Sequence, residues 1–312
     1  MQILAINARI EAARAGRVGD GFAVVANEVA GISRRIQGEA DALRGDLCSR
    51  VDDLSKLGAE LVAQVYGTRL VDLAHNLIEI IDRNLYERSC DVRWWATESA
   101  VVEACGGGSG EACSRRLAVI LRSYTVYADI VVLGPDGRVL ANGQAPQASL
   151  AGQDLSGRTW FARALATANG EEFVADDIAR EPLLGGRAMA VYATAVREGG
   201  RSDGAVIGVV AVLFDWERQA QTVVDGVRLD ADERSHTRCL VLDSRHRVIA
   251  ASDRRGVLEE TLPLPASPAI GWVRQDGAIL AWALTPGFET YQGLGWFGVI
   301  VKDTTTIGHP SC

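Results

Sequence analysis

Two helical stripes of apolar residues, separated by glycines, open the chain. In the first stripe, alanines are interleaved with Ile6 and Ile10 at helical spacing, and alanine has the highest helix propensity of any residue. The second stripe runs from Phe22 to Ile36 in alternating steps of three and four, the spacing of a coiled-coil seam. Three glycines within residues 16–21 permit positive φ, so they can end one helix and reverse the chain. The pattern therefore predicts a helical hairpin.

A long helix is expected after the hairpin turn. From Phe22 to about Ala104 the chain contains no proline, and apolar positions recur at helical spacing as far as Ile81. This predicts one long helix or two nearly continuous ones, which at about 1.5 Å per residue could exceed about 100 Å. The glycines at 106–108 are a strong stop signal. Trp94 and Trp95 point about 100° apart on a helix, so we expect only one of them to pack on the following domain.

Three glycines lie one heptad apart on one face of this helix: Gly31, Gly38 and Gly45. Each costs about 1 kcal/mol relative to alanine in a helix. They indicate either a flexible face that lets a helical bundle switch, or close packing against a neighbour.

After Leu117 the period changes from that of helices to that of strands. Short helices are expected within 155–170 and near 216–227. Residues 128–141 read as strand, Pro-Asp-Gly turn, strand, and residues 239–252 repeat that logic. The remaining strands are expected within 171–178, 187–198, 205–214 and 270–303.

Composition narrows the class of partner. The 312 residues are enough for two or three domains, and 48% apolar content supports ordinary buried cores. A net charge of −8 and a pI near 5.2 argue against nucleic acid or an anionic membrane surface as the main partner. The best apolar run, 205–214, is too short to span a bilayer, and the N-terminus lacks the pattern of a signal peptide. We therefore expect a soluble, cytoplasmic chain.

No constellation of catalytic or metal-ligating residues is apparent. The four histidines stand apart, without the spacing of a metal site, and GGGSG at 106–110 lacks the lysine of a phosphate-binding loop. The six cysteines are scattered, which favours free thiols in a reducing compartment. A redox role for Cys105 and Cys113, which flank the glycine loop, is the alternative. We expect no enzyme activity, no metal and no cofactor.

The segments INARIEAARAG (6–16) and GFAVVANEV (21–29) resemble the signalling tip of methyl-accepting chemotaxis receptors. In that family the tip is the turn of a long antiparallel coiled coil that contacts a histidine autokinase and its coupling protein. The resemblance implies a homodimer through the coiled coil. It also implies trimer or kinase contacts for five residues: Asn7, Glu11, Arg14, Phe22 and Val24. Arg17 and Asp20 depart from the family, which commonly has Glu and Arg there; the swap either reverses a charge pair or reflects decay.

The arms of the hairpin are unequal. Met1 falls inside the ascending arm, which leaves about four turns of helix before the glycines. Either the reading frame is truncated, or another chain supplies the missing surface. The methylation patches of the family cannot be placed on this sequence.

Residues 85–303 resemble a Cache domain, the PAS-like sensor of many chemoreceptors and sensor kinases. A long first helix, the GPDGRV turn, an RTWF element at 158–161 and a glycine-led strand carry the resemblance. Two lobes, about 118–225 and 237–303, indicate the double form. The predicted parts are a signalling tip at 1–50, a connecting helix with the first Cache helix at 51–116, the sensor at 117–303 and a tail at 304–312.

Cache domains bind small ligands in the lobe farther from the membrane end of the helix. By resemblance, Arg158 would pair a ligand carboxylate and Trp160 and Phe161 would line the pocket. Further contacts are expected from Asp176 or Asp177 and from two hydroxyls: Tyr192 and Thr194. For these four residues a core or turn role is the alternative, and for Arg158 and Trp160 a structural role.

One departure bears on the ligand. Amino-acid-binding members place an aspartate where this chain has Leu213, and Asp215 lies two residues later. An α-amino group would lose its main counter-charge, so we expect an organic acid or another small metabolite rather than a common amino acid.

The sequence as a whole predicts an α+β protein: a chemoreceptor-like coiled coil followed by antiparallel sheets in two PAS-like lobes. The function it favours is a transducer that senses a small molecule and regulates a chemotaxis histidine kinase. Two alternatives stay open: a truncated receptor that retains only ligand binding, and a coiled-coil scaffold with a structural sensor.

Overall fold

The computed structural model describes residues 2–144 and 150–304. The chain divides into two compact units, Met1–Tyr66 and Gly67–Cys312. The predicted tail begins at Thr304, and its remaining residues, like Met1, lie outside the described part. Among the described residues, no helix combines the length and the apolar character that crossing a bilayer requires.

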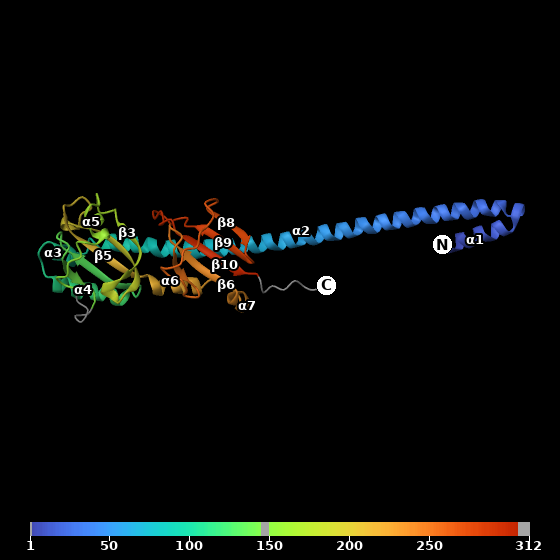
Figure 1. The fold of residues 1–312 in the computed structure, drawn as a ribbon. Coiled ribbons are helices and arrows are strands. Elements are labelled where there is room, and N and C mark those ends of the chain that lie inside the picture. The colour runs from blue at the N-terminus through green and yellow to red at the C-terminus, as the bar shows by residue number, and fades with distance from the viewer. Residues whose placement is uncertain (1, 145–149, 305–312) are drawn as a thin grey trace. The chain divides into compact units, whose positions relative to one another are not determined.

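The first unit is a helical hairpin. Helix α1 (Gln2–Arg14) is followed by a short 3-10 turn, η1 (Gly16–Val18), and by α2, which starts at Asp20 (Figure 1). Gly16 has φ +58°, a region that glycine adopts without strain. A Cβ on Gly19 would lie 2.2 Å from the carbonyl oxygen of Ala12, so only glycine fits there. The turn predicted from the three glycines is thereby explained by backbone geometry.

Helix α2 continues to Trp95 and is 76 residues long. Residues 96–98 separate it from α3 (Ser99–Cys105), which ends at the predicted glycine stop, and α4 (Gly110–Ser123) follows. Of the two predicted forms, one long helix or two nearly continuous ones, the structure has the second. Trp95 is buried against Tyr127 while Trp94 stays 66% exposed, as their spacing predicts.

The first lobe of the second unit is a five-stranded antiparallel sheet in the order β2-β1-β5-β4-β3. Its strands are β1 (Tyr127–Leu133), β2 (Val139–Asn142), β3 (Val174–Glu181), β4 (Arg187–Arg197) and β5 (Val206–Asp215). Helix α5 (Thr159–Leu165) precedes β3, and two 3-10 turns, η3 (Pro182–Leu184) and η4 (Glu198–Gly200), flank β4.

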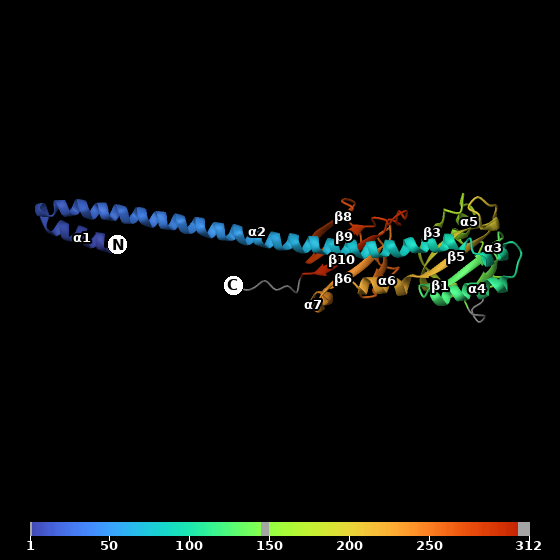
Figure 2. The same cartoon turned by 180° about the vertical axis from the view of Figure 1, so that it is seen from behind.

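Helix α6 (Trp216–Asp225) and the short α7 (Ala231–Ser235) lead into the second lobe, which repeats the same architecture. Its antiparallel sheet has the order β7-β6-β10-β9-β8. The strands are β6 (Thr237–Leu242), β7 (Val248–Ala251), β8 (Ile270–Gln275), β9 (Ala278–Leu284) and β10 (Phe297–Asp303). Figure 2 shows the two sheets from the other side, with the C-terminal part of α2 running along both. The predicted two-lobed α+β fold is confirmed.

Each sheet buries two faces, because alternate residues of a strand point to opposite sides. In the first lobe, Tyr192, Val210 and Val212 join a core with α2 residues from Leu70 to Trp95. The opposite face, including Val191 and Leu213, packs against Trp160 and Phe161 around α5. Which face a residue of β4 or β5 points to therefore decides whether it meets α2 or α5.

Candidate functional sites

The hairpin tip presents exposed apolar side chains. Phe22 is 75% exposed and Val24 is 66% exposed, although both belong to a well-formed helix. Ala12 and Ala26 are buried, so the two helices close on each other through small side chains. Large exposed apolar residues beside a close-packed turn are typical of a protein interaction surface.

The polar residues predicted at the tip lie on α1. Asn7 is exposed, and Arg14 donates to Glu11 at 3.0 Å one turn away. Both side chains of this ion pair are more than two-thirds exposed, so the pair contributes little stability and both groups remain accessible to a partner. All five residues predicted at the tip thus lie on the short α1–α2 hairpin.

Buried and partly buried polar contacts tie α2 to the second lobe. Arg69 donates two hydrogen bonds to Glu233, at 2.5 and 2.8 Å, and Lys302 lies 3.4 Å from the same carboxylate. The hydrogen bond from Arg69 is the main reason that the pKa of Glu233 falls to about 2. Asp82, 1% exposed, accepts from the hydroxyl of Thr285 and from the amide of Gly287 at 2.9 Å.

A second set of buried polar contacts ties α2 to the first lobe. Arg88 is 3% exposed and lies 3.3 Å from Asp91, which accepts a 2.5 Å hydrogen bond from the hydroxyl of Tyr127. The Arg88 guanidinium also stacks over the rings of Tyr127 and Phe214, 5.0 and 5.5 Å from their centroids. One helix therefore makes specific contacts with both sheets.

Three residues predicted to form the ligand pocket lie around α5. Arg158 donates to Glu181 at 2.8 Å, while Trp160 and Phe161 are 5% and 4% exposed within the core that also contains Leu213. Leu213 therefore lies among apolar side chains, and this position offers no carboxylate to a ligand. Asp215 instead pairs with Arg187 at 2.8 Å and caps α6.

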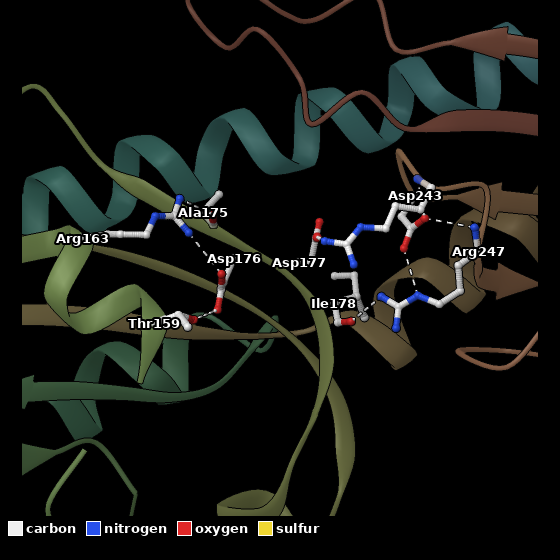
Figure 3. A network of polar contacts seen from close by, with 9 residues as sticks. Thr159, Arg163, Ala175, Asp176, Asp177, Ile178, Asp243 and Arg247 are labelled. Atoms are coloured by element: carbon white, nitrogen blue, oxygen red, sulfur yellow. Dashed lines mark hydrogen bonds and ion pairs between the residues drawn. The ribbon is translucent and has the colours of Figure 1, made fainter. Parts of the chain in front are cut away.

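Asp176 and Asp177 lie on β3 but face different neighbours (Figure 3). Asp176 accepts from Thr159 at 3.0 Å and from Arg163 at 3.2 Å, both on α5. Asp177 points toward the second lobe, where its carboxylate lies 4.0 Å from the guanidinium of Arg245. Consecutive residues of a strand point to opposite faces of the sheet, which explains why these two aspartates have different neighbours.

Tyr192 and Thr194 lie on the α2 side of the sheet, opposite Trp160 and Phe161. The Tyr192 hydroxyl is 3.0 Å from that of Tyr291 in the second lobe, and Phe173 stacks on both rings. Thr194 donates to the carbonyl of Glu172 at 2.6 Å. The seven predicted ligand residues therefore do not converge on one cavity: α5 gathers Arg158, Trp160, Phe161 and Asp176, whereas Asp177 and Tyr192 face the second lobe.

Some contacts between the lobes are made by residues that were not predicted from the sequence to be functional. Arg247 donates to the carbonyl of Ile178 at 3.0 Å and is held by Asp243 at 2.9 Å (Figure 3). Tyr291 supplies the partner of Tyr192. Nothing in the spacing of these residues distinguishes them from ordinary turn and strand positions, because the contacts join segments far apart in the chain.

Asp129 is a second residue that the sequence did not single out. It is fully buried in β1 and accepts from Asn142 at 2.8 Å and from the amides of Ile130, Gly143 and Gln144. Burial raises its pKa to about 6 despite these hydrogen bonds, which favour the charged form. A lone aspartate within the apolar run ADIVVL is the signal that could have identified it.

Comparison with known proteins gives sequence relatives for the N-terminal part of the chain and solved structures of similar fold for the rest. Residues 1–81 match the family model of the methyl-accepting chemotaxis protein (MCP) signalling domain. The chain is 58% identical over 43 residues to TlpQ of Pseudomonas aeruginosa, which is 14% of this chain and 6% of TlpQ. It is 38% identical over 80 residues to methyl-accepting chemotaxis protein IV of Escherichia coli, which is 26% of this chain and 15% of that protein. The chain thus spans only a small part of these relatives.

The fold of the second unit has solved counterparts. The extracellular domain of the putative histidine kinase rpHK1S-Z16 aligns with 79% of this chain and 97% of its own, with a TM-score of 0.59 and 16% identity. The ligand-binding domain of the Pseudomonas aeruginosa chemoreceptor PctC, in complex with GABA, aligns with 76% of this chain and 99% of its own, with a TM-score of 0.55 and 16% identity. At this identity the likeness shows a shared fold.

Proposed function

We propose that this chain is a chemoreceptor-like transducer, in which a small molecule bound by the two-lobed sensor regulates a histidine autokinase through the hairpin tip. The observation that carries the proposal is the extent of α2. This single helix contains Phe22 and Val24 of the tip as well as Asp82, Arg88 and Asp91, which contact the sensor. In this proposal residues 1–50 are the tip, 51–116 the connecting helix and 117–303 the sensor.

The proposed mechanism is a shift between two arrangements of the sensor. A ligand can shift such an equilibrium only by binding one arrangement more tightly than the other. The contacts between the lobes, Tyr192 with Tyr291 and Arg247 with Ile178, are the ones that such a shift would alter. Because α2 is pinned to both lobes through buried polar groups, a change in their relative position acts on this helix. The chain itself would catalyse no reaction.

The ligand class in this proposal is an organic acid. Leu213 packs in an apolar core, and the nearest aspartate along β5, Asp215, is already paired with Arg187. A ligand ammonium group at Leu213 would therefore stay without a counter-charge, which is costly in a buried site. A thermal-shift screen of the common amino acids checks this: a rise of several degrees with any of them contradicts it.

Phe22 provides the sharpest test of the output. Because its side chain is 75% exposed, Phe22→Ala should leave the fold intact, and removal of an apolar anchor from an interface typically costs more than about 1 kcal/mol. We expect this variant to lose control of kinase autophosphorylation in a mixture with kinase and coupling protein.

Leu57→Ala is the matched control, since Leu57 is 61% exposed on α2 but lies outside the tip motif. It should behave as the unmodified chain, with equal helicity by circular dichroism in all three proteins. If neither the unmodified chain nor the variants change kinase activity, the proposed kinase regulation is wrong. Ligand binding alone would then remain as the alternative function.

A further inference from the structure

A small cavity of about 170 Å³ lies in the first lobe, where α2 ends. Its walls come from four segments: the end of α2 with residues 96–97, the segment before β3, the end of β4, and the turn from η4 toward β5. The volume lies below the range of sites for drug-sized molecules, about 300–1,000 Å³, so the cavity suits a ligand of a few heavy atoms. None of the seven predicted ligand residues lines it.

Arg197, the last residue of β4, is a buried cation at this cavity: it is 7% exposed. Two of its five N–H groups donate to backbone carbonyls, those of Thr167 and, at 3.0 Å, of Gly204. Its Nε is buried without a hydrogen-bond partner, and it forms no ion pair with any residue that the structure describes. Because a buried charge without a counter-charge is costly, this position favours an anion beside the guanidinium.

Two further arginines line the cavity. Arg93, on α2, donates to the carbonyls of Ser89 at 2.8 Å and Glu171 at 3.3 Å, and within residues 2–144 and 150–304 no carboxylate pairs with it. Arg201 pairs with Asp203 at 3.0 Å, but both side chains are more than two-thirds exposed. Water screens such a pair, so the Arg201 guanidinium stays available to a ligand.

The lining is positive by each way of counting. It holds three arginines and one carboxylate, that of Glu171, which is exposed. Among groups without an ion pair to a described residue, two arginines face this one glutamate. With Asp203, which lies outside the lining, three guanidinium groups face two carboxylates. Glu172 and Glu198 do not line the cavity; the first accepts from a backbone amide at 2.8 Å, and the second is exposed.

The rest of the lining is polar or small. The Ser202 hydroxyl accepts from the amide of Gly170 at 3.2 Å, and no acceptor in the described part of the chain takes its proton, so this hydroxyl can donate to a ligand. A Cβ on Gly170 would lie 2.9 Å from the Cα of Ser202, so these two segments are closely packed. The apolar side chains in the lining are the methyl groups of Ala96 and Ala195, which offer little surface to an organic body.

We propose that this cavity binds a tetrahedral inorganic oxyanion, phosphate or sulfate. Guanidinium groups reach it from three segments, α2, β4 and the turn after η4, and can form charge-assisted hydrogen bonds. Donors on several sides suit a tetrahedral anion, whose oxygens point in four directions, better than a carboxylate, whose two oxygens share one plane. The anion supplies the counter-charge that Arg197 lacks and joins the end of α2 to β4. This site goes beyond the proposed function and does not depend on it.

The test is isothermal titration calorimetry of the full chain with phosphate, sulfate and acetate, at constant ionic strength set by chloride. We expect phosphate or sulfate to bind with a dissociation constant below about 1 mM and acetate to bind at least about tenfold more weakly. Arg93→Gln combined with Arg201→Gln should weaken binding of the oxyanion by about tenfold or more, while Arg197 stays in place to hold its loops. Glu171→Gln should bind at least as tightly as the unmodified chain, because it removes the carboxylate from the lining.

Arg122→Gln is the matched control, because Arg122 is exposed on α4 and does not line the cavity. It should bind as the unmodified chain does, which separates binding at this site from the general effect of phosphate and sulfate on folded proteins. The proposal is overturned if neither oxyanion binds at about 10 mM, or if acetate binds as tightly. Unchanged affinity in the double arginine variant, or weaker binding in Glu171→Gln, would overturn it as well.

Discussion

At the scale of single residues, Asp129 shows how burial acts on a carboxylate. This carboxylate is fully buried in β1, and its pKa is raised to about 6 because desolvation disfavours the charged form. An acid with a raised pKa in the folded state binds its proton more tightly there than in the unfolded chain. Its charge therefore costs the folded state stability above about pH 6, and this cost disappears as the pH falls through 6 toward 4.

The prediction for Asp129 follows from that sign. Between pH 7 and pH 4 the contribution of Asp129 to the free energy of unfolding should rise by about 3 kcal/mol at most, since each unit of pKa shift is worth about 1.4 kcal/mol. Urea unfolding followed by tryptophan fluorescence reports on the second unit, which contains all seven tryptophans. Asp129→Asn should flatten the pH dependence, and Asp136→Asn, an exposed turn position, should not. An unchanged pH profile in Asp129→Asn would contradict the assignment.

Individual residues also mark where prediction from sequence ends. The glycines of the hairpin and the stop at 106–108 were predictable, because φ and helix propensity depend on the local chain. The convergence of Tyr192 with Tyr291 was not, since those residues are 99 positions apart and meet only when both sheets have formed. The partners of Asp176 on α5 and of Asp177 in the second lobe were not predictable either, because those segments meet β3 only in the folded chain.

At the scale of elements, α2 meets the second lobe through a partly buried carboxylate on α7, that of Glu233. Glu233 closes a capping box with Asp230 and also accepts two hydrogen bonds from Arg69. Its depressed pKa, about 2, means that its contribution to stability is present above about pH 4.5 and is lost as the pH falls through 2. The Arg69 side chain is 41% exposed, so solvent screening reduces the contribution below what the pKa shift alone implies.

We therefore expect Glu233→Gln to destabilise the second unit by about 1–2 kcal/mol at pH 7 and by much less near pH 2. Thermal unfolding at the two pH values measures the difference. Glu259→Gln is the matched control, because Glu259 is exposed and forms no ion pair with any described residue. An equal loss of stability at both pH values would indicate that packing, rather than the charge, is responsible.

At the scale of the whole molecule, the order of elements was the most predictable property. The spacing of apolar residues along the chain indicates the order of helices and strands. Two lobes form because each strand–turn–strand unit needs further strands to bury its faces. The cavity of about 820 Å³ between the lobes could not be predicted, since its lining combines alanines of β4, α6 and β7, which meet only in the folded chain. Local patterns thus specify elements, whereas a site formed between lobes depends on their packing.

The exposed stripe on α2 leads to the last prediction. Between Leu43 and Val65 the helix keeps large apolar residues more than half exposed at coiled-coil spacing, among them Leu47, Leu54 and Leu61. Within the described part of the first unit, these side chains remain exposed, so no described residue there covers the stripe. A helix with an uncovered apolar seam gains stability by packing against a second copy, which would form the homodimer that the resemblance to chemotaxis receptors implies.

Replacing the seam leucines should therefore separate the copies. Leu47→Asp combined with Leu54→Asp would bury two unpaired carboxylates from each copy in the dimer, each costing several kcal/mol. The double variant should therefore be a monomer in sedimentation velocity experiments. Lys56→Asp places the same carboxylate on the opposite face of the helix and should leave the dimer intact. Near-UV circular dichroism of the sensor should be unchanged in all variants, because its tryptophans lie beyond Tyr66. The prediction is wrong if the unmodified chain is a monomer or if the dimer persists in the double variant. In either case this stripe does not pack against a second copy.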